Sequence, residues 1–375
     1  MIGHKPKDTQ KELEKMKESL SDVTAFMKEY ARKVDKMLGD SLSLVSSDRS
    51  VQKLLGRSGY EYDPEAIEQG IIKPSMYLLE GGGKRLRPAI TYLVVEALGK
   101  NPDNFIEFTL VPEVIHNATL IKDDIEDESR YRRNRLTVHE SFGNAIAINA
   151  GDFMYFFPFV AIVDSPKLSV ETKFKIFSTF FKDMTRISLG QATDIVWSKG
   201  DVDLEKISSE KYLRMVNDKT GVLISFACKL GAILCEANEE TVNALGKFGS
   251  KLGVAFQIQD DILNLFESSV SKSKGGVGDD ITEGKKSLLV IKTLESASPA
   301  DRNRLEVLLN MHTKDQKLIQ EAISIITKYG AREEAEKIAM DELSKAWKEV
   351  HKLLPDSAAK KRLGSIAYFV LGRTN

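Results

Sequence analysis

The sequence has few cysteines, no long apolar run and almost no net charge. Its 375 residues include 54 Lys and Arg and 55 Asp and Glu, so the net charge is −1. A chain with this balance has no overall attraction to nucleic acid or to an anionic membrane. The longest apolar run, residues 153–163, contains Pro158 and is too short to span a bilayer. Any binding of anions must therefore come from local clusters of basic residues.

The two cysteines, Cys228 and Cys235, are seven residues apart, which fits neither a zinc site nor a redox pair. We expect two buried thiols on one face of a helix, in a reducing compartment. The first residues, among them Lys5, Lys7 and Asp8, lack the apolar core of a signal peptide. The expected location is the cytoplasm.

Signals for β-strands are scarce, because alternating patterns bounded by tight-turn dipeptides are missing. No proline occurs between Pro166 and Pro299, which favours long helices. Apolar residues recur at helical spacing, and we expect helices at 204–221, 222–237, 241–266, 318–328 and 333–353. The simplest architecture is one large all-α domain.

A charged amphipathic segment comes before this domain. Apolar residues at steps of three and four predict a helix over residues 8–38, and Gly39 is a plausible end. The segment from Ser41 to Asp63 is polar and resembles a connector. We therefore divide the chain into an N-terminal helical extension with its connector, residues 1–63, and a helical domain, residues 64–375. The extension is expected to be an appendage or an oligomer contact.

Two acidic clusters follow apolar helical runs, DDIED at 123–127 and DDILN at 260–264. Residues four apart share a helix face, so Asp123 points the same way as Asp127, and Asp260 the same way as Asn264. Like charges at this spacing destabilise a helix, and partial burial adds to the cost, so a cation should offset them. Mg²⁺ prefers one or two carboxylates together with phosphates of the substrate. Two solvated acidic helix turns are the alternative.

Basic residues complete the pattern. The segment GGGKRLRP at 81–88 combines a flexible backbone with Lys84, Arg85 and Arg87, and it lacks the spacing of a Walker loop. Further basic groups lie at 132–133, at 219–221 and at 274–286. Each group alone could be a solvated surface patch. Together with two carboxylate clusters they indicate a site for more than one diphosphate.

In their order, these motifs resemble those of the trans-isoprenyl diphosphate synthases, also called polyprenyl synthetases. The resemblance covers roughly residues 65–373 and implies a single helical bundle of the isoprenoid synthase type around a central cavity. The matching segments are 82–88, 116–133, 143–152, 190–194, 219–221, 256–261 and 278–285. The implied activity is head-to-tail condensation of isopentenyl diphosphate with an allylic diphosphate.

The resemblance also implies roles for single residues. Three Mg²⁺ ions would hold the allylic diphosphate, bound by Asp123, Asp127 and Asp260 with help from Asp124, Asp261 and Asn264. The cations that neutralise this diphosphate would be Arg132, Lys219, Lys274 and Lys285. Isopentenyl diphosphate would occupy a metal-free pocket formed by Lys84, Arg87, His116 and Arg133. The allylic cation would be stabilised by Thr220, Gln257 and the carbonyl of Lys219.

Three positions depart from the family pattern. Lys122 stands where the family often has His or an apolar residue. Asn264 replaces the usual Asp and should bind Mg²⁺ or its waters more weakly. Lys274 lies eleven residues before Lys285, a wider gap than usual, so a role for Lys285 is better supported.

The small residues Ala118 and Thr119 precede the first acidic cluster, where short-chain members usually carry an aromatic floor. Ile115 lies one turn deeper, and the aromatic stripe at 153–159 could form a deeper floor or an ordinary core. We therefore predict geranylgeranyl diphosphate as the main product, with a longer or shorter polyprenyl diphosphate as the alternative.

Three other functions remain open. A class I terpene cyclase would need no second diphosphate pocket, and a regulatory subunit of a heteromeric synthase usually loses one acidic cluster. A scaffold built on the N-terminal helix is the third possibility. The resemblance implies a homodimer.

Overall fold

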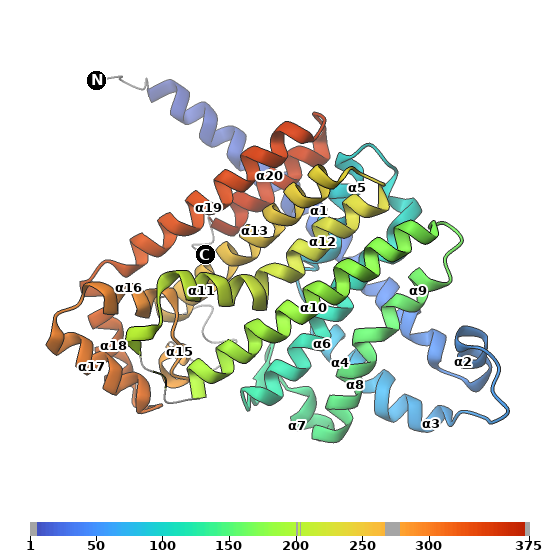
Figure 1. The fold of residues 1–375 in the computed structure, drawn as a ribbon, viewed down its shortest axis with the longest axis horizontal. Coiled ribbons are helices and arrows are strands. Elements are labelled where there is room, and N and C mark those ends of the chain that lie inside the picture. Colours follow the sequence, from blue (N-terminus) through green and yellow to red (C-terminus); the bar gives the residue numbers. More distant parts are fainter. Residues whose placement is uncertain (1–5, 200–201, 203, 267–277, 372–375) are drawn as a thin grey trace.

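The computed structural model describes residues 6–199, 202, 204–266 and 278–371, and it is built almost entirely of helices (Figure 1). The sheet in this part of the chain is one antiparallel pair, β1 (Tyr131–Arg132) with β2 (Arg135–Leu136). The expected all-α architecture is confirmed.

The first half of the chain contains ten α-helices within the described residues. Their bounds are α1 (Pro6–Leu42), α2 (Asp48–Leu55), α3 (Pro64–Ile67), α4 (Lys73–Glu80), α5 (Leu86–Ala97), α6 (Val111–Glu126), α7 (Val138–Phe142), α8 (Asn144–Phe156), α9 (Val160–Val163) and α10 (Val170–Lys199). Short 3₁₀ turns lie at Ser43–Val45, Pro102–Leu110 and Phe157–Phe159, and a π-helical turn lies at Glu68–Ile72.

The described helices of the second half are α11 (Ser209–Val216), α12 (Val222–Leu234), α13 (Glu239–Phe266), α15 (Asp279–Thr282), α16 (Leu288–Ser296), α17 (Pro299–Asn310), α18 (Gln316–Lys328), α19 (Ala331–Leu353) and α20 (Ala358–Leu371). A 3₁₀ turn lies at Leu204–Lys206, and a π-helical turn, Asn217–Gly221, joins α11 to α12.

The five predicted helices are present, but several bounds differ. Three of them begin two residues earlier than predicted, at Glu239, Gln316 and Ala331, and α12 ends at Leu234 instead of 237. The helix predicted to begin at 204 begins at Ser209, because the side chain of Ser208 caps it by accepting a hydrogen bond from the backbone N of Lys211. Figure 1 shows α12 between α10 and α13, in the middle of the bundle. Every residue of α12 is buried except Lys229, so this apolar helix forms the centre of the core.

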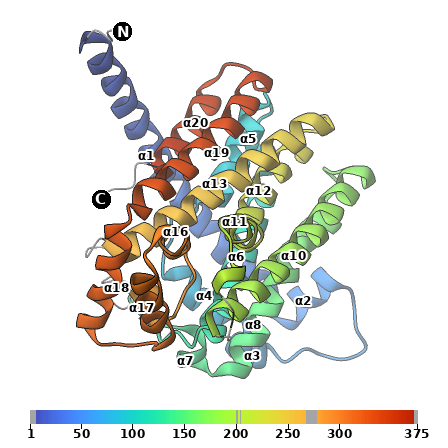
Figure 2. The same cartoon turned by 60° about the vertical axis from the view of Figure 1, so that its left-hand side comes forward.

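Helix α1 runs past Gly39 to Leu42, so glycine does not end it as expected. Its first turns extend away from the body, as both ribbon views show (Figures 1 and 2). Its second half is part of the core, since Val34, Leu38 and Leu42 are buried against α4, α5 and α6. The polar connector also contains helix α2. The division of the chain at residue 63 stays a prediction.

The two cysteines lie on α12 and at its end. Cys228 is buried and Cys235 is half-buried, so the expectation of buried thiols is confirmed for the first. Burial raises the pKa of Cys228 to about 12 and that of Cys235 to about 11. Both thiols are therefore protonated and unreactive at neutral pH.

One stretch of the described residues, Asn144–Val163, is long and apolar enough to cross a membrane, with a mean hydropathy of 1.7. Of this stretch 39% is buried in the body, where Gly151 of α8 packs against Ile121 of α6. Length and composition do not distinguish a membrane helix from a core helix. The absence of a membrane span stays a prediction.

Candidate active site

Helix α6 presents the first acidic cluster. It begins with Pro112 in its first turn, where no backbone N–H is needed, and it ends at Glu126. The N–H of Asp127 donates to the carbonyl of Asp123 at 2.8 Å, so the last turn is closed. The predicted four-residue spacing of these two carboxylates is therefore present at the C-terminal end of the helix.

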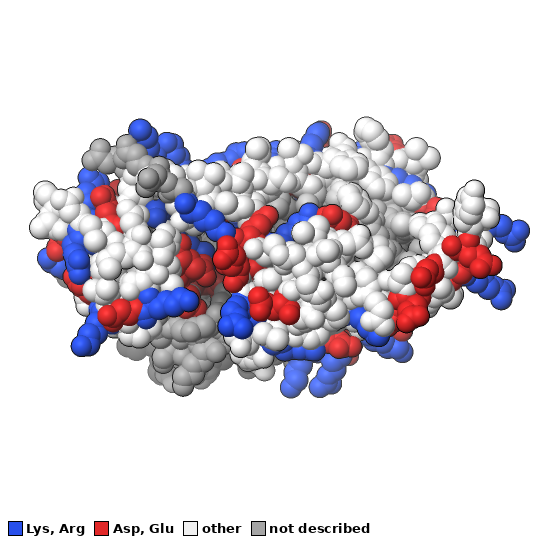
Figure 3. All heavy atoms as spheres, turned by 90° about the horizontal axis from the view of Figure 1, so that it is seen from below, with Lys and Arg blue, Asp and Glu red and all other residues white. Residues whose placement is uncertain are grey.

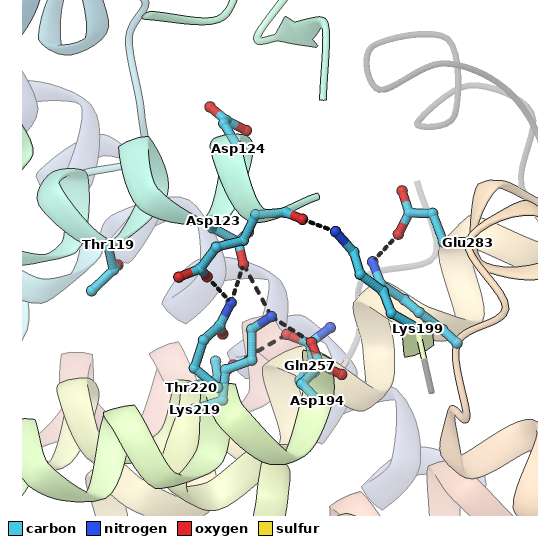
Figure 4. Close-up of polar contacts among 12 residues, drawn as sticks. Thr119, Asp123, Asp124, Asp194, Lys199, Lys219, Thr220, Gln257 and Glu283 are labelled. Carbon is cyan, nitrogen blue, oxygen red and sulfur yellow. Dashed lines mark hydrogen bonds and ion pairs between the residues drawn. The ribbon is translucent and has the colours of Figure 1, made fainter. Parts of the chain in front are cut away.

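Asp123 points toward basic and amide side chains of neighbouring helices (Figure 4). Lys219 lies 3.0 Å from its carboxylate, and the amide of Gln191 on α10 donates to it at 3.2 Å. Burial alone would raise the pKa of Asp123, but Lys219 and Arg132 outweigh it and lower this pKa. The carboxylate is therefore charged in the bundle interior.

Asp124 points the opposite way (Figure 4). Arg132 of β1 donates from Nε to both oxygens of Asp124, at 2.7 and 2.9 Å. The side chain is only 2% exposed, and this burial raises the pKa of Asp124 to about 6 despite the guanidinium. Asp124 therefore holds Arg132 in place, while Asp123 faces the space between the helices.

Asp127 lies in the field of the last basic residue of the predicted site. Burial and the nearby charge of Asp123 raise the pKa of Asp127 to about 6, while Lys285 and Lys219 oppose this rise. Lys285 pairs with Glu283 at 2.5 Å and with Asp280 at 3.6 Å. Lys285 thus brings positive charge from the loop after α15 to the end of α6.

The second acidic cluster lies on α13, and both carboxylate oxygens of Asp261 accept hydrogen bonds. The hydroxyl of Tyr212 donates to Asp261 at 2.6 Å, and the amide of Gln257 donates to its other oxygen at 2.9 Å. Burial and the charge of Asp280 raise the pKa of Asp261 to about 7. The oxygen of Gln257 in turn accepts from the hydroxyl of Thr220 at 3.3 Å. Asp261 therefore fixes the direction of the Gln257 amide dipole.

Asn264 accepts a hydrogen bond from the backbone N–H of Asp280 at 3.2 Å. Through this contact the side chain ties α13 to the first turn of α15. Asp260 is half-buried one residue before Asp261. Lys274 lies outside the described residues.

Close packing between helices brings Lys219 and Thr220 to the site. A Cβ atom on Gly190 of α10 would overlap the backbone of Lys219, and one on Gly253 of α13 would lie 2.6 Å from the Cα of Gly221. Only glycine permits these approaches. The π-helical turn at Asn217–Gly221 is thereby held between α10 and α13, with Lys219 directed at Asp123.

Sequence reasoning missed two polar residues of α10. Asp194 pairs with Lys219 at 2.6 Å, and Gln191 donates to Glu126 at 2.6 Å as well as to Asp123. The signal was present, because Gln191 and Asp194 are three residues apart in a matching motif and share a helix face. Lys219 is thus shared between carboxylates of α6 and α10.

A second, cationic group of side chains lies at the start of α5, on α6 and in the turn after β1. His116, Arg87 and Arg133 are close enough that the two guanidinium charges, added to burial, lower the pKa of His116 well below its usual value. Burial lowers the pKa of Arg87 to about 10, and its buried Nε has no hydrogen-bond partner among the described residues. A buried donor without a partner is costly unless a ligand satisfies it. These residues therefore form a pocket suited to an anion.

The other members of this predicted pocket are arranged differently. Arg133 donates to the carbonyls of Gly82 and Leu78. Lys84 is exposed, with its ammonium 5.3 Å from the ring centre of Phe369 on α20. The structure thus brings Arg87, His116 and Arg133 together and places Lys84 at the surface beside them.

The predicted chain-length residues do not share one environment. Thr119 is half-buried on the same side of α6 as Asp123, and Ile115 is buried one turn below it, among Phe108, Phe159 and Phe180. Ala118 is completely buried against α8, next to Met154. Of the aromatic stripe, Phe156 is 65% exposed and points away from the core, so it is not part of a floor.

The donor chemistry of the acidic clusters fits Mg²⁺. Among the described residues no group of three or more His, Cys, Asp or Glu is gathered tightly enough to hold a metal ion by itself. Mg²⁺ usually binds one or two carboxylates and takes further oxygens from phosphates, so a pair such as Asp123 and Asp127 is sufficient. On the face seen in Figure 3, acidic side chains gather near the middle, next to basic ones.

Comparisons with known proteins show which family this chain resembles. The polyprenyl synthetase family model matches residues 68–326. The short chain isoprenyl diphosphate synthase of Methanothermobacter thermautotrophicus is 33% identical over 354 residues, which are 94% of this chain and 99% of that protein. The geranylgeranyl pyrophosphate synthase of Geoglobus acetivorans is 37% identical over 256 residues, 68% of this chain and 77% of that protein. The crystal structure of geranylgeranyl pyrophosphate synthetase from Pyrococcus horikoshii has a TM-score of 0.78 at 31% identity, covering 94% of this chain and 99% of that one.

Proposed function

The chain belongs to the polyprenyl synthetase family, and we propose that it condenses isopentenyl diphosphate head-to-tail with an allylic diphosphate. The observation that carries this proposal is a pair of different anion sites in one bundle. One site combines Asp123 and Asp127 with Lys219, and the other combines Arg87, Arg133 and His116. A terpene cyclase would need only the first of these sites.

In this proposal the allylic diphosphate binds between the two acidic clusters with Mg²⁺. The residues that would hold three ions are Asp123, Asp127 and Asp260, with Asp124, Asp261 and Asn264 in support. When bound, Mg²⁺ supplies positive charge that stabilises the diphosphate as the carbon–oxygen bond breaks. Burial in an apolar surrounding strengthens this effect and excludes water.

Residues of the chain itself carry the remaining steps. Lys219, which is shared between Asp123 and Asp194, adds a fixed positive charge beside the departing diphosphate, as do Arg132 and Lys285. The oxygens of Thr220 and Gln257 face the allylic carbon and stabilise its positive charge. Asp261 and Tyr212 keep the Gln257 amide in this orientation.

Isopentenyl diphosphate binds in the cationic pocket without a metal. Arg87 and Arg133 offer guanidinium donors to its diphosphate, and neutral His116 supplies a further hydrogen bond. Lys84 closes the pocket from the surface. The departing diphosphate accepts the proton that is lost after the new bond forms, so no dedicated base is needed.

We propose geranylgeranyl diphosphate as the main product. Thr119 is small and leaves room below Asp123, while the cluster of Phe108, Phe159 and Phe180 around Ile115 closes the deeper end. Relatives with geranylgeranyl diphosphate synthase in their names support this length.

We further propose that the protein acts as a homodimer in the cytoplasm. Phe174, Phe181, Leu189 and Val196 of α10 are all more than half exposed and recur at steps of seven and eight residues. They form one apolar helix face, which a second copy of the chain would cover.

The proposed function is tested by incubating the purified protein with isopentenyl and farnesyl diphosphates and identifying the product by mass spectrometry. We expect a twenty-carbon diphosphate that forms with Mg²⁺ and disappears with excess EDTA. A main product of fifteen carbons, or of more than thirty, would contradict the chain-length proposal. Activity only after addition of a partner protein would identify a regulatory subunit instead.

A further inference from the structure

Arg85 lies between Lys84 and Arg87 but is not part of either anion site. Its side chain is 1% exposed, and its backbone has φ 48° and ψ 39°, a left-handed conformation that non-glycine residues rarely adopt. It occupies the position directly before α5. Such a conformation persists only where the surroundings hold it.

The guanidinium of Arg85 joins three helices to the glycine loop, residues 81–84. It donates to Asp35 of α1 at 2.7 Å, to Glu113 of α6 at 3.0 Å and to the carbonyl of Leu79 in α4 at 2.6 Å. A Cβ on Gly83 would lie 3.2 Å from the guanidinium of Arg85 and 3.3 Å from that of Arg133. Glycine therefore lets the loop lie directly over both guanidinium groups.

Glu113 is the partner that matters for the neighbouring pocket. Its side chain is 3% exposed. Its negative charge stabilises the charged forms of Arg87 and Arg133 and so raises the pKa of each, against the effect of burial. Without Arg85, this buried carboxylate would lose its ion pair and would still attract those two guanidinium groups. It would then compete directly with a diphosphate for them.

We propose that Arg85 is a positioning residue for isopentenyl diphosphate. It pairs with Glu113 and Asp35 and holds the glycine loop in place. Arg87 and Arg133 therefore remain available to the diphosphate. The inference rests on the proposed function for the identity of the ligand. It also connects helix α1 to the pocket through Arg85, since Asp35 belongs to the N-terminal segment.

The test measures binding of isopentenyl diphosphate by calorimetry in buffer with EDTA, so that neither metal nor catalysis is involved. We expect Arg85→Gln to raise the dissociation constant about tenfold or more, since Glu113 is then released toward Arg87 and Arg133. Arg85→Lys keeps the charge but loses the fork geometry, so its effect should be intermediate. The double variant Arg85→Gln with Glu113→Gln should recover most of the binding, which a purely structural role of Arg85 would not predict.

Arg362→Gln is the matched control. It removes another Arg–Asp contact of α1, the pair of Arg362 on α20 with Asp22 at 2.8 Å, which involves neither Glu113 nor Asp35. We expect it to leave isopentenyl diphosphate binding unchanged. Unchanged binding in folded Arg85→Lys or Arg85→Gln, or no recovery in the double variant, would overturn the inference. So would a parent protein that does not bind isopentenyl diphosphate in EDTA. Binding without any condensation activity would contradict the proposed function and leave the role of Arg85 intact.

Discussion

Adjacent residues of the first acidic cluster have different tasks because a helix points them to different sides. Asp123 contacts Lys219 and Gln191 in the space between α6, α10 and α13. Both carboxylate oxygens of Asp124, in contrast, accept hydrogen bonds from Arg132. The same holds in the second cluster, where Asp261 orients Gln257 and leaves Asp260 as the candidate ligand. In each motif one carboxylate thus makes structural contacts, while the other is the candidate metal ligand.

This difference predicts unequal effects of two matched substitutions. Asp123→Asn should lower kcat by about a hundredfold or more, because it removes a charged ligand from the diphosphate site. Asp124→Asn keeps an acceptor for Arg132 and should lower kcat by less than about tenfold. Both are measured at saturating Mg²⁺ and substrates, with melting temperatures to confirm folding. Equal losses of kcat would show that the two carboxylates share one role.

The motifs selected residues that the structure brings together, but they did not predict the contacts that hold these residues. Asp123, Lys219 and Gln257 follow from short sequence patterns, and the structure places them together. The anchoring of Asp261 by Tyr212 could not be predicted, because it depends on how α11 packs against α13. Arg85 had a visible charge but no visible partner, since Asp35 and Glu113 are remote in the sequence.

Helix α6 connects the diphosphate site to the depth of the proposed chain cavity. Ile115, Thr119 and Asp123 are spaced by four residues and share one face, while Ala118 lies on the side that packs against α8. The sequence predicted both small residues as determinants of product length. It could not separate them, because the orientation of α6 toward α8 is a tertiary property.

An aromatic side chain at these two positions should therefore act differently. Thr119→Phe should place a ring below Asp123 and shorten the main product to fifteen carbons. Ala118→Phe should instead overpack the contact with α8 and lower the stability by about 1–3 kcal/mol. Chromatography of the products and thermal melting measure the two effects. An unchanged product from folded Thr119→Phe would contradict this geometry.

At the scale of the whole molecule, the bundle surrounds its buried centre but leaves one long apolar face uncovered. That face follows α10, a helix that periodicity did not single out because its apolar residues occupy both its buried and its exposed sides. The all-α class followed from the scarcity of strand signals and the proline-free stretch. The inclusion of α1 in the core did not, since its buried residues meet α4, α5 and α6, which are separated from it by the connector.

A charge on the exposed face of α10 should prevent dimer formation. Phe181→Lys would have to bury an ammonium group in the proposed interface, which disfavours association by several kcal/mol, so we expect monomers at about micromolar concentration. Val307→Lys, at a half-exposed position of α17, is the control and should leave the dimer intact. Light scattering after size-exclusion chromatography gives the mass. A parent protein that is already monomeric would contradict the proposed interface.

We propose that carboxylates of α6 and α13 hold one diphosphate through shared divalent ions. Anomalous diffraction from crystals with Mn²⁺ and the unreactive analogue farnesyl thiodiphosphate shows where the ions and the diphosphate bind. We expect metal peaks next to Asp123, Asp127 and Asp260, with the diphosphate between the two helices and Lys219 in contact with it. A diphosphate bound away from these residues, or metal peaks only at the molecular surface, would refute the proposal.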